Sequence, residues 1–110
     1  MKANMKTLPR NATQGTQDVK AAQAGGLETL LGQALASRSS GRHERALDLL
    51  RQAAVRDLRR PEPWYWIGRI QEELHDSMGA AYSYFMSRER GRYEPASVAL
   101  RRMGHLPKES

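Results

Sequence analysis

The chain has 110 residues, no cysteine and a net charge of +6 at pH 7. This length has room for one small domain, and the cysteine count excludes disulfides, thiolate metal sites and a cysteine nucleophile. Arginine carries most of the positive charge. Because guanidinium groups pair well with carboxylates and phosphates, acidic partners come into consideration.

The N-terminal segment 1–26 contains no aromatic residue and few large apolar side chains. Such a segment buries too little surface to offset its ordering entropy. We therefore predict a disordered or frayed tail over 1–26, a helical domain over 27–104 and a short tail over 105–110. No segment approaches the roughly 18 apolar residues of a membrane span, and the N-terminus does not resemble a secretory signal. We expect a cytoplasmic protein without membrane contacts.

From Leu27 onward, apolar side chains recur at three- and four-residue spacing, which predicts helices. The first helix is expected to stop near Gly41, since glycine readily adopts the left-handed conformation that ends helices. The second is expected over 42–58. Its apolar stripe consists of Ala46, Leu47, Leu50, Ala53 and Ala54.

The third helix is expected to begin at 61–63, where prolines suit a first turn, and to run to about Leu74. Asp76 is placed to cap a fourth helix, which ends before Arg90. The apolar and aromatic residues of that fourth helix are Met78, Ala81, Tyr82, Phe85 and Met86. A last helix is expected over 96–103, with Val98, Leu100 and Met103 packing it as a cap on the preceding helices. No β-type alternation competes with this all-α prediction.

Parts of the sequence repeat at a distance of 34 residues. Ala46 and Ala80 are related by this offset, and so are Leu50 and Tyr84. A helix–turn–helix unit that recurs at 34 residues predicts two antiparallel hairpins in an α-solenoid fragment. The short last helix then caps the second hairpin.

In this pattern the chain resembles the tetratricopeptide repeat family, and the unit at 61–94 matches best. The residues that stand at the family's structural positions are Gly41, Ala46, Leu50, Trp64, Ile67, Gly68, Ala80 and Tyr84. The sequence departs from the family at Gln33 and Ala34, which replace a Leu-Gly pair, and at His75, which replaces the glycine between the helices. The resemblance covers residues 27–104.

The third helix carries three consecutive aromatic residues that point in different directions, because each residue turns the helix by about 100°. Trp64 shares one side with Ile67, Gly68 and Gln71, which we expect to pack against the fourth helix. Tyr65 and Arg69 lie on the opposite side, and Trp66 lies at its margin.

In the tetratricopeptide family, the first helices of successive repeats line a concave groove that binds peptides or partner helices. The resemblance therefore implies a candidate groove. Its members are Leu31, Leu35, Arg38, Tyr65, Trp66, Arg69, Ala99 and Met103. Tyrosine, tryptophan and arginine often anchor such contacts. The alternative is that Tyr65 and Trp66 only pack against the neighbouring hairpin.

The leading functional hypothesis is a small non-enzymatic adaptor or chaperone that binds another protein without a cofactor. By resemblance, small chaperones of bacterial secretion systems are the nearest class in size. Self-association could supply burial that a two-repeat array lacks. A second hypothesis is nucleic-acid binding through clustered arginines, which would be strongly salt-dependent. These clusters are Arg56, Arg59 and Arg60, then Arg88, Arg90 and Arg92, then Arg101 and Arg102.

The residues do not suggest an enzyme or a metal site. His43, His75 and His105 stand at expected helix junctions and not on one helix face. The sequence has no His-Glu-x-x-His arrangement, phosphate-binding loop or nucleophile elbow. We therefore expect no catalytic residue and no metal ligand.

Overall fold

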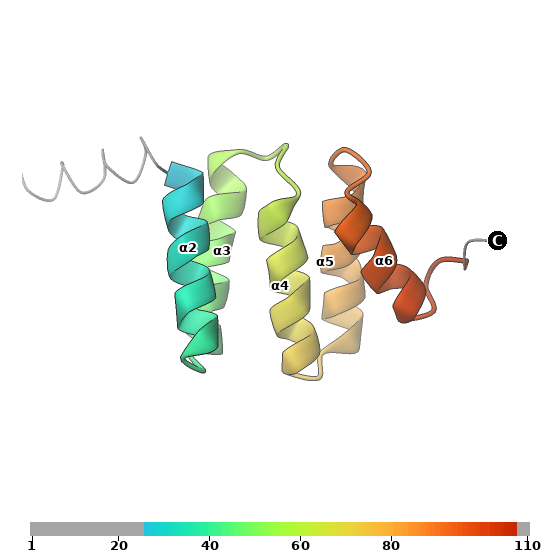
Figure 1. Cartoon of the computed structure of the whole chain (residues 1–110), viewed down its shortest axis with the longest axis horizontal. Coiled ribbons are helices and arrows are strands. Elements are labelled where there is room, and N and C mark those ends of the chain that lie inside the picture. Colours follow the sequence, from blue (N-terminus) through green and yellow to red (C-terminus); the bar gives the residue numbers. More distant parts are fainter. Residues whose placement is uncertain (1–25, 108–110) are drawn as a thin grey trace, which may run out of the picture.

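The computed structural model describes residues 26–107, which form five α-helices and, within that range, no β-strand. The helices are α2 (Gly26–Ser39), α3 (His43–Arg56), α4 (Glu62–Glu73), α5 (Ser77–Glu89) and α6 (Glu94–Arg102). Consecutive helices pack against each other, and Figure 1 shows α2, α4 and α6 in a front layer with α3 and α5 behind them. The all-α fold of two hairpins and a final helix is confirmed. The tail predicted over 1–26 lies outside the described residues except for Gly26, which begins α2.

The helix boundaries at the two hairpin turns reproduce the 34-residue period of the sequence. The last residues of α2 and α4 are Ser39 and Glu73, and the first residues of α3 and α5 are His43 and Ser77. Each pair is separated by 34 positions. The two hairpins are therefore equivalent units, and the period belongs to the helices themselves and not only to scattered residue matches.

The turns inside the two hairpins have the same geometry although their central residues differ. Gly41 has a φ of 80°, and the non-glycine residue His75 has a φ of 65° at the equivalent position. In each turn the next backbone N–H, of Arg42 or Asp76, donates a 2.8 Å hydrogen bond to a carbonyl five residues earlier. This bond satisfies a free carbonyl at the helix end, as left-handed C-caps do. The helix-ending role predicted for Gly41 is confirmed.

Local signals also explain where the later helices begin. The Asp76 carboxylate accepts a 3.0 Å hydrogen bond from the backbone N–H of Gly79, so the predicted N-cap of α5 is confirmed. Pro63 and Pro95 lie in the first turns of α4 and α6, where a missing N–H costs nothing. Helix α3 ends at Arg56, two residues earlier than predicted, because Asp57 has an extended backbone.

Two apolar clusters form the interior. The first joins α2 and α3 to one side of α4, and the second joins α5 to α6. Trp64 and Trp66 pack against the first cluster, whereas Tyr65 packs against the second. The first cluster also contains Ile67. The prediction that Ile67 packs against the fourth helix of the domain, α5, was wrong, because α4 turns this side chain toward the hairpin of α2 and α3.

Helices α4 and α5 approach each other closely at Gly68. A Cβ atom built on this glycine would lie 2.7 Å from Cε1 of Tyr84, so only a glycine fits beside the buried tyrosine ring. Two buried serines of α5 support the same contact. Ser83 donates a 2.6 Å hydrogen bond to Gln71 Oε1, and Ser87 donates a 2.8 Å bond to the carbonyl of Pro61. Both buried hydroxyls are thus satisfied.

Helix α6 packs on α5, and of its three predicted packing residues Leu100 and Met103 contribute to the second cluster. Leu100 is fully buried, as expected, whereas Val98 is 49% exposed. The small side chains of Ala96 and Ala99 complete the buried side. Leu106, beyond the helix, also packs against the second cluster.

Candidate functional site

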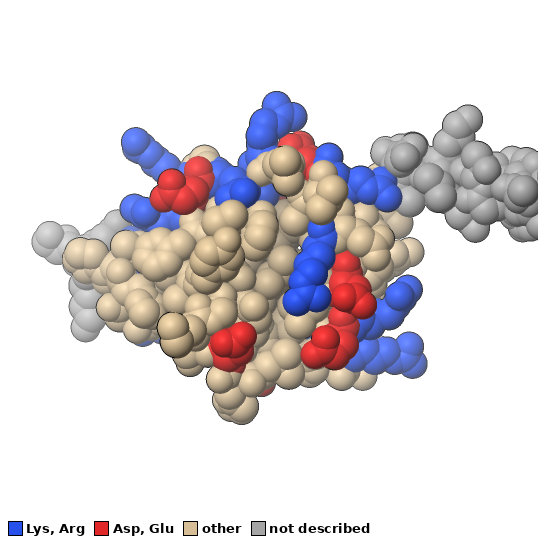
Figure 2. Space-filling model, turned by 180° about the vertical axis from the view of Figure 1, so that it is seen from behind, with Lys and Arg blue, Asp and Glu red and all other residues tan. Residues whose placement is uncertain are grey.

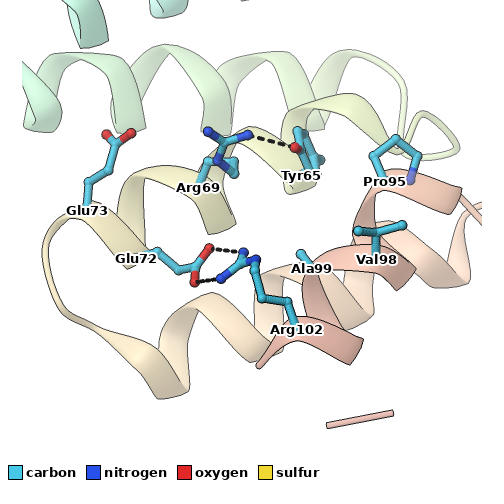
Figure 3. A pocket seen from close by; sticks show the side chains of 8 residues that line it. All are labelled: Tyr65, Arg69, Glu72, Glu73, Pro95, Val98, Ala99 and Arg102. Atoms are coloured by element: carbon cyan, nitrogen blue, oxygen red, sulfur yellow. Dashed lines mark hydrogen bonds and ion pairs between the residues drawn. The ribbon is translucent and has the colours of Figure 1, made fainter. Parts of the chain in front are cut away.

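A pocket of about 460 Å³ lies between α4 and α6 (Figure 3). It is lined by Tyr65, Arg69, Glu72, Glu73, Pro95, Val98, Ala99 and Arg102. Helical spacing explains the set, because residues three, four and seven positions apart share one side of a helix. Each helix therefore contributes one continuous side to the pocket.

A tyrosine–arginine pair forms one wall. The Tyr65 hydroxyl accepts a 2.8 Å hydrogen bond from Nη1 of Arg69, which raises the pKa of the arginine above its ordinary value. No carboxylate pairs with Arg69 among residues 26–107. Glu72 and Glu73 act on its charge at longer range, but the guanidinium group has no short ion pair within this range of residues and can meet an anionic group that enters the pocket.

A fixed ion pair closes the opposite wall, as Figure 3 shows. Nη1 and Nη2 of Arg102 lie 2.9 and 2.8 Å from the two carboxylate oxygens of Glu72. The Tyr84 hydroxyl donates a further 2.6 Å bond to Glu72. The hydrogen bond from Arg102 lowers the pKa of Glu72. The pKa of Tyr84 is raised, mainly because the hydroxyl is buried and also because it donates to the Glu72 carboxylate. Glu72 is thus held as an anion between two donors.

Trp66 lies beside the pocket, between two arginines. The guanidinium carbons of Arg38 and Arg69 lie 5.3 and 5.5 Å from the centre of its ring, within cation–π range. Arg38 also forms an ion pair with Glu73, in which Nε lies 2.9 Å from Oε2, and this pair lowers the pKa of Glu73. Two guanidinium groups thus lie within cation–π range of the Trp66 ring beside the pocket.

The residues predicted to form the groove have different surroundings. Tyr65, Arg69 and Ala99 line the pocket together, and Arg38 and Trp66 adjoin it. The other three do not line it. Leu31 is buried in the first cluster, Leu35 is half-buried on α2, and Met103 packs against the second cluster.

The groove predicted from the sequence omitted five of the lining residues. They are Glu72, Glu73, Pro95, Val98 and Arg102. Helical spacing from Tyr65 already placed both glutamates on its side of α4. No local pattern showed that α6 would bring Pro95 and Val98 opposite them, because that contact depends on how α6 packs on α5.

Tyr65 has both a structural and a surface role. Its ring centre lies 5.8 Å from those of Tyr84 and Tyr93, and 5.2 Å from that of Trp66. Trp64 turns to the other side of the molecule, where its ring meets Tyr82 edge-on at 6.4 Å and Arg90 covers it at 5.3 Å. Its buried indole Nε1 has no hydrogen-bond partner. The three consecutive aromatics therefore do not form one ligand cage.

Internal contacts engage several arginines of the predicted basic clusters. Arg60 pairs with Glu28 and Glu62, and Arg90 donates to the carbonyls of Leu58 and Met86. These bonds leave fewer guanidinium groups for phosphates. Nucleic-acid binding stays a prediction.

The three histidines do not converge. His43 lies 3.4 Å from Glu73, His75 forms the α4–α5 turn, and His105 stacks edge-on against Phe85. Within the described range, no group of three or more histidine and acidic side chains is arranged to hold a metal ion. None of the helices between residues 26 and 107 is both long enough and apolar enough to cross a membrane.

Comparisons with models of protein families, with curated proteins and with solved structures found no match to this chain.

Proposed function

We propose that this chain is a small tetratricopeptide-like interaction module, without enzymatic activity, that binds a peptide or amphipathic helix at the α4–α6 pocket. The observation that carries the proposal is the composition of that pocket. It combines an arginine without a carboxylate partner, Arg69, with aromatic and aliphatic surface from Tyr65, Val98 and Pro95. Partner helices are commonly held by such apolar anchors together with charged contacts.

The proposal also specifies the chemistry of the partner. The apolar side of the pocket fits an aliphatic or aromatic side chain. Because Arg69 is the available cation, a glutamate or aspartate about one helical turn away on the partner would reach it. Adaptor and chaperone functions both fit this kind of recognition.

The test is selection of a random peptide library on the full chain, followed by binding measurements with the selected peptides. Arg69→Gln should weaken the selected peptides by at least about tenfold, which corresponds to 1.4 kcal/mol. Arg69 is a better target than Tyr65, whose ring supports the second cluster. Tyr65→Phe, which keeps the ring, isolates the contribution of the hydroxyl.

Gln52→Glu is the control, since Gln52 is exposed on α3, away from the pocket. It should leave peptide binding unchanged. Selected peptides that bind the Arg69→Gln variant and a Val98→Asp variant as tightly as the native chain would show that the pocket is not the binding site.

A further inference from the structure

The side of α5 that faces away from the molecule carries three large apolar residues, Met78, Tyr82 and Phe85, which we call the outer stripe. Met78 is 86% exposed and Tyr82 is 60% exposed, while Phe85 is half-buried. Their spacing of four and three residues places them on one side of the helix. Figure 2 shows a broad area without charged side chains on this face, on the side of the molecule where α5 and α6 lie.

In the preceding hairpin, the equivalent side of α3 is exposed to solvent and carries charged residues. The positions of α3 that correspond to the outer stripe are Glu44, Asp48 and Arg51, and all three are exposed. Asp48 and Arg51 form an ion pair along the helix. The outer stripe is therefore a property of α5 and not of the hairpin fold.

Part of the outer stripe also packs inside the chain, since the Tyr82 ring meets Trp64 edge-on and Phe85 packs against the second cluster. The buried side of α5 consists of small residues, two hydrogen-bonded serines and one tyrosine: Ala80, Ala81, Ser83, Tyr84 and Ser87. A helix with serines inside and methionine outside reverses the usual distribution. Neighbouring exposed apolar side chains such as Met78 and Tyr82 are typical of a surface that contacts another molecule.

The charges at the two ends of α5 indicate which molecule that is. Asp76 is exposed just before the helix and Arg92 is exposed just after it, and neither forms an ion pair within residues 26–107. The last turn of α5 also carries the exposed Glu89, which lies 4.0 Å from Arg88, and with Arg90 and Arg92 this end is net basic. When two copies of α5 lie antiparallel about a two-fold axis, the acidic end of each meets the net basic end of the other. The outer stripes meet in the middle, so the surface is complementary to itself.

We propose that two copies of this chain associate through the outer stripe of α5, antiparallel, with Asp76 of each copy directed toward Arg92 of the other. Helix α5 belongs to the rear layer, and the α4–α6 pocket opens between two helices of the front layer (Figure 1). The dimer therefore leaves both pockets accessible. Loss of dimerisation and loss of peptide binding can be observed separately.

Sedimentation equilibrium of the full chain over a range of concentrations is the test. We expect a monomer–dimer equilibrium in which Met78→Glu or Tyr82→Asp raises the dissociation constant at least about tenfold. Gln52→Glu introduces the same charge change as Met78→Glu at an exposed position of α3 and should have no effect. Circular dichroism establishes that the variants retain their helices.

The orientation of the two copies is tested by charge. Arg92→Glu should weaken the dimer by placing a carboxylate near Asp76 of the other copy. Arg92→Glu should weaken the dimer less in an Asp76→Asn background, because asparagine is retained as an N-cap residue but carries no charge. A chain that is monomeric at every concentration, or a dimer that folded Met78→Glu and Tyr82→Asp variants leave intact, overturns the proposal. An Arg92→Glu effect that is the same in both backgrounds overturns the antiparallel arrangement.

Discussion

Two glycines of the front-layer helices have opposite surroundings and so make a matched test of packing. A Cβ at Gly68 would meet the ring of Tyr84, whereas a Cβ at Gly32 would meet nothing within 4 Å. Gly68→Ala should lower the free energy of unfolding by about 1–3 kcal/mol, because the buried ring has no space to move into. Gly32→Ala should raise it by about 0.5–1 kcal/mol through helix propensity. Urea unfolding of both variants checks this, and equal stability of the two would mean that α4 and α5 do not approach as closely as described.

The two hairpin turns form a second matched pair at the residue scale. His75 has a positive φ of 65°, a conformation that costs a side chain free energy and costs glycine little. His75→Gly should therefore stabilise the chain by about 1 kcal/mol, and Gly41→His should destabilise it by a similar amount. Thermal unfolding measures both. A destabilised His75→Gly variant would indicate that the imidazole makes a contact worth more than the backbone strain.

At the scale of elements, the pair between Glu72 of α4 and Arg102 of α6 makes stability depend on pH. Since Arg102 lowers the pKa of Glu72 in the folded chain below the ordinary 4.5, the pair stabilises the fold fully above that value. This contribution is lost as the pH falls from 4.5 through the folded-state pKa. Glu72→Gln should thus lower the free energy of unfolding at pH 7. In acid, the free energies of unfolding of the variant and of the native chain should become more similar. Urea midpoints measured at pH 7 and pH 3 test this.

Glu44→Gln is the control for the pH prediction, because Glu44 is exposed and forms no ion pair in the described part of the chain. If the loss of stability caused by Glu72→Gln stays constant down to pH 3, the ion pair is not the cause of that loss.

Helix periodicity and capping residues predicted the elements well, but only part of how they pack. Gly41 and Asp76 marked helix ends correctly because their effects are local. The sequence did not predict which side of α5 is buried, since Ser83 and Ser87 are buried while Met78 is exposed. The two serines are buried because they donate hydrogen bonds to Gln71 and to the carbonyl of Pro61, contacts that depend on how α4 and α5 pack. Likewise, periodicity grouped Tyr65 with Arg69, but the opposite wall of the pocket depends on how α6 packs.

At the scale of the whole molecule, α6 closes the second cluster and supplies Arg102. A chain that ends at Tyr93 should therefore lose more helical signal than the nine residues of α6 contribute, and should unfold at lower temperature. A chain that ends at Pro107 is the control and should behave as the native protein. Circular dichroism during heating compares them. A truncated chain that loses only the signal of α6 and keeps its midpoint would show that the first four helices are self-sufficient.

Glu72 and Glu73 are neighbours in the sequence, yet their carboxylates bind arginines in opposite directions, Arg102 on α6 and Arg38 on α2. These ion pairs connect the front-layer helices to one another and are partly exposed to solvent, in addition to the buried apolar contacts that join α4 to the first hairpin and α6 to α5. Salt screens exposed charges but not apolar packing. Added salt should therefore weaken the ionic part of the contacts between the front-layer helices and leave the buried apolar part in place. Because Glu72 and Arg102 both line the pocket, we expect salt to loosen this wall of the pocket before it affects the fold.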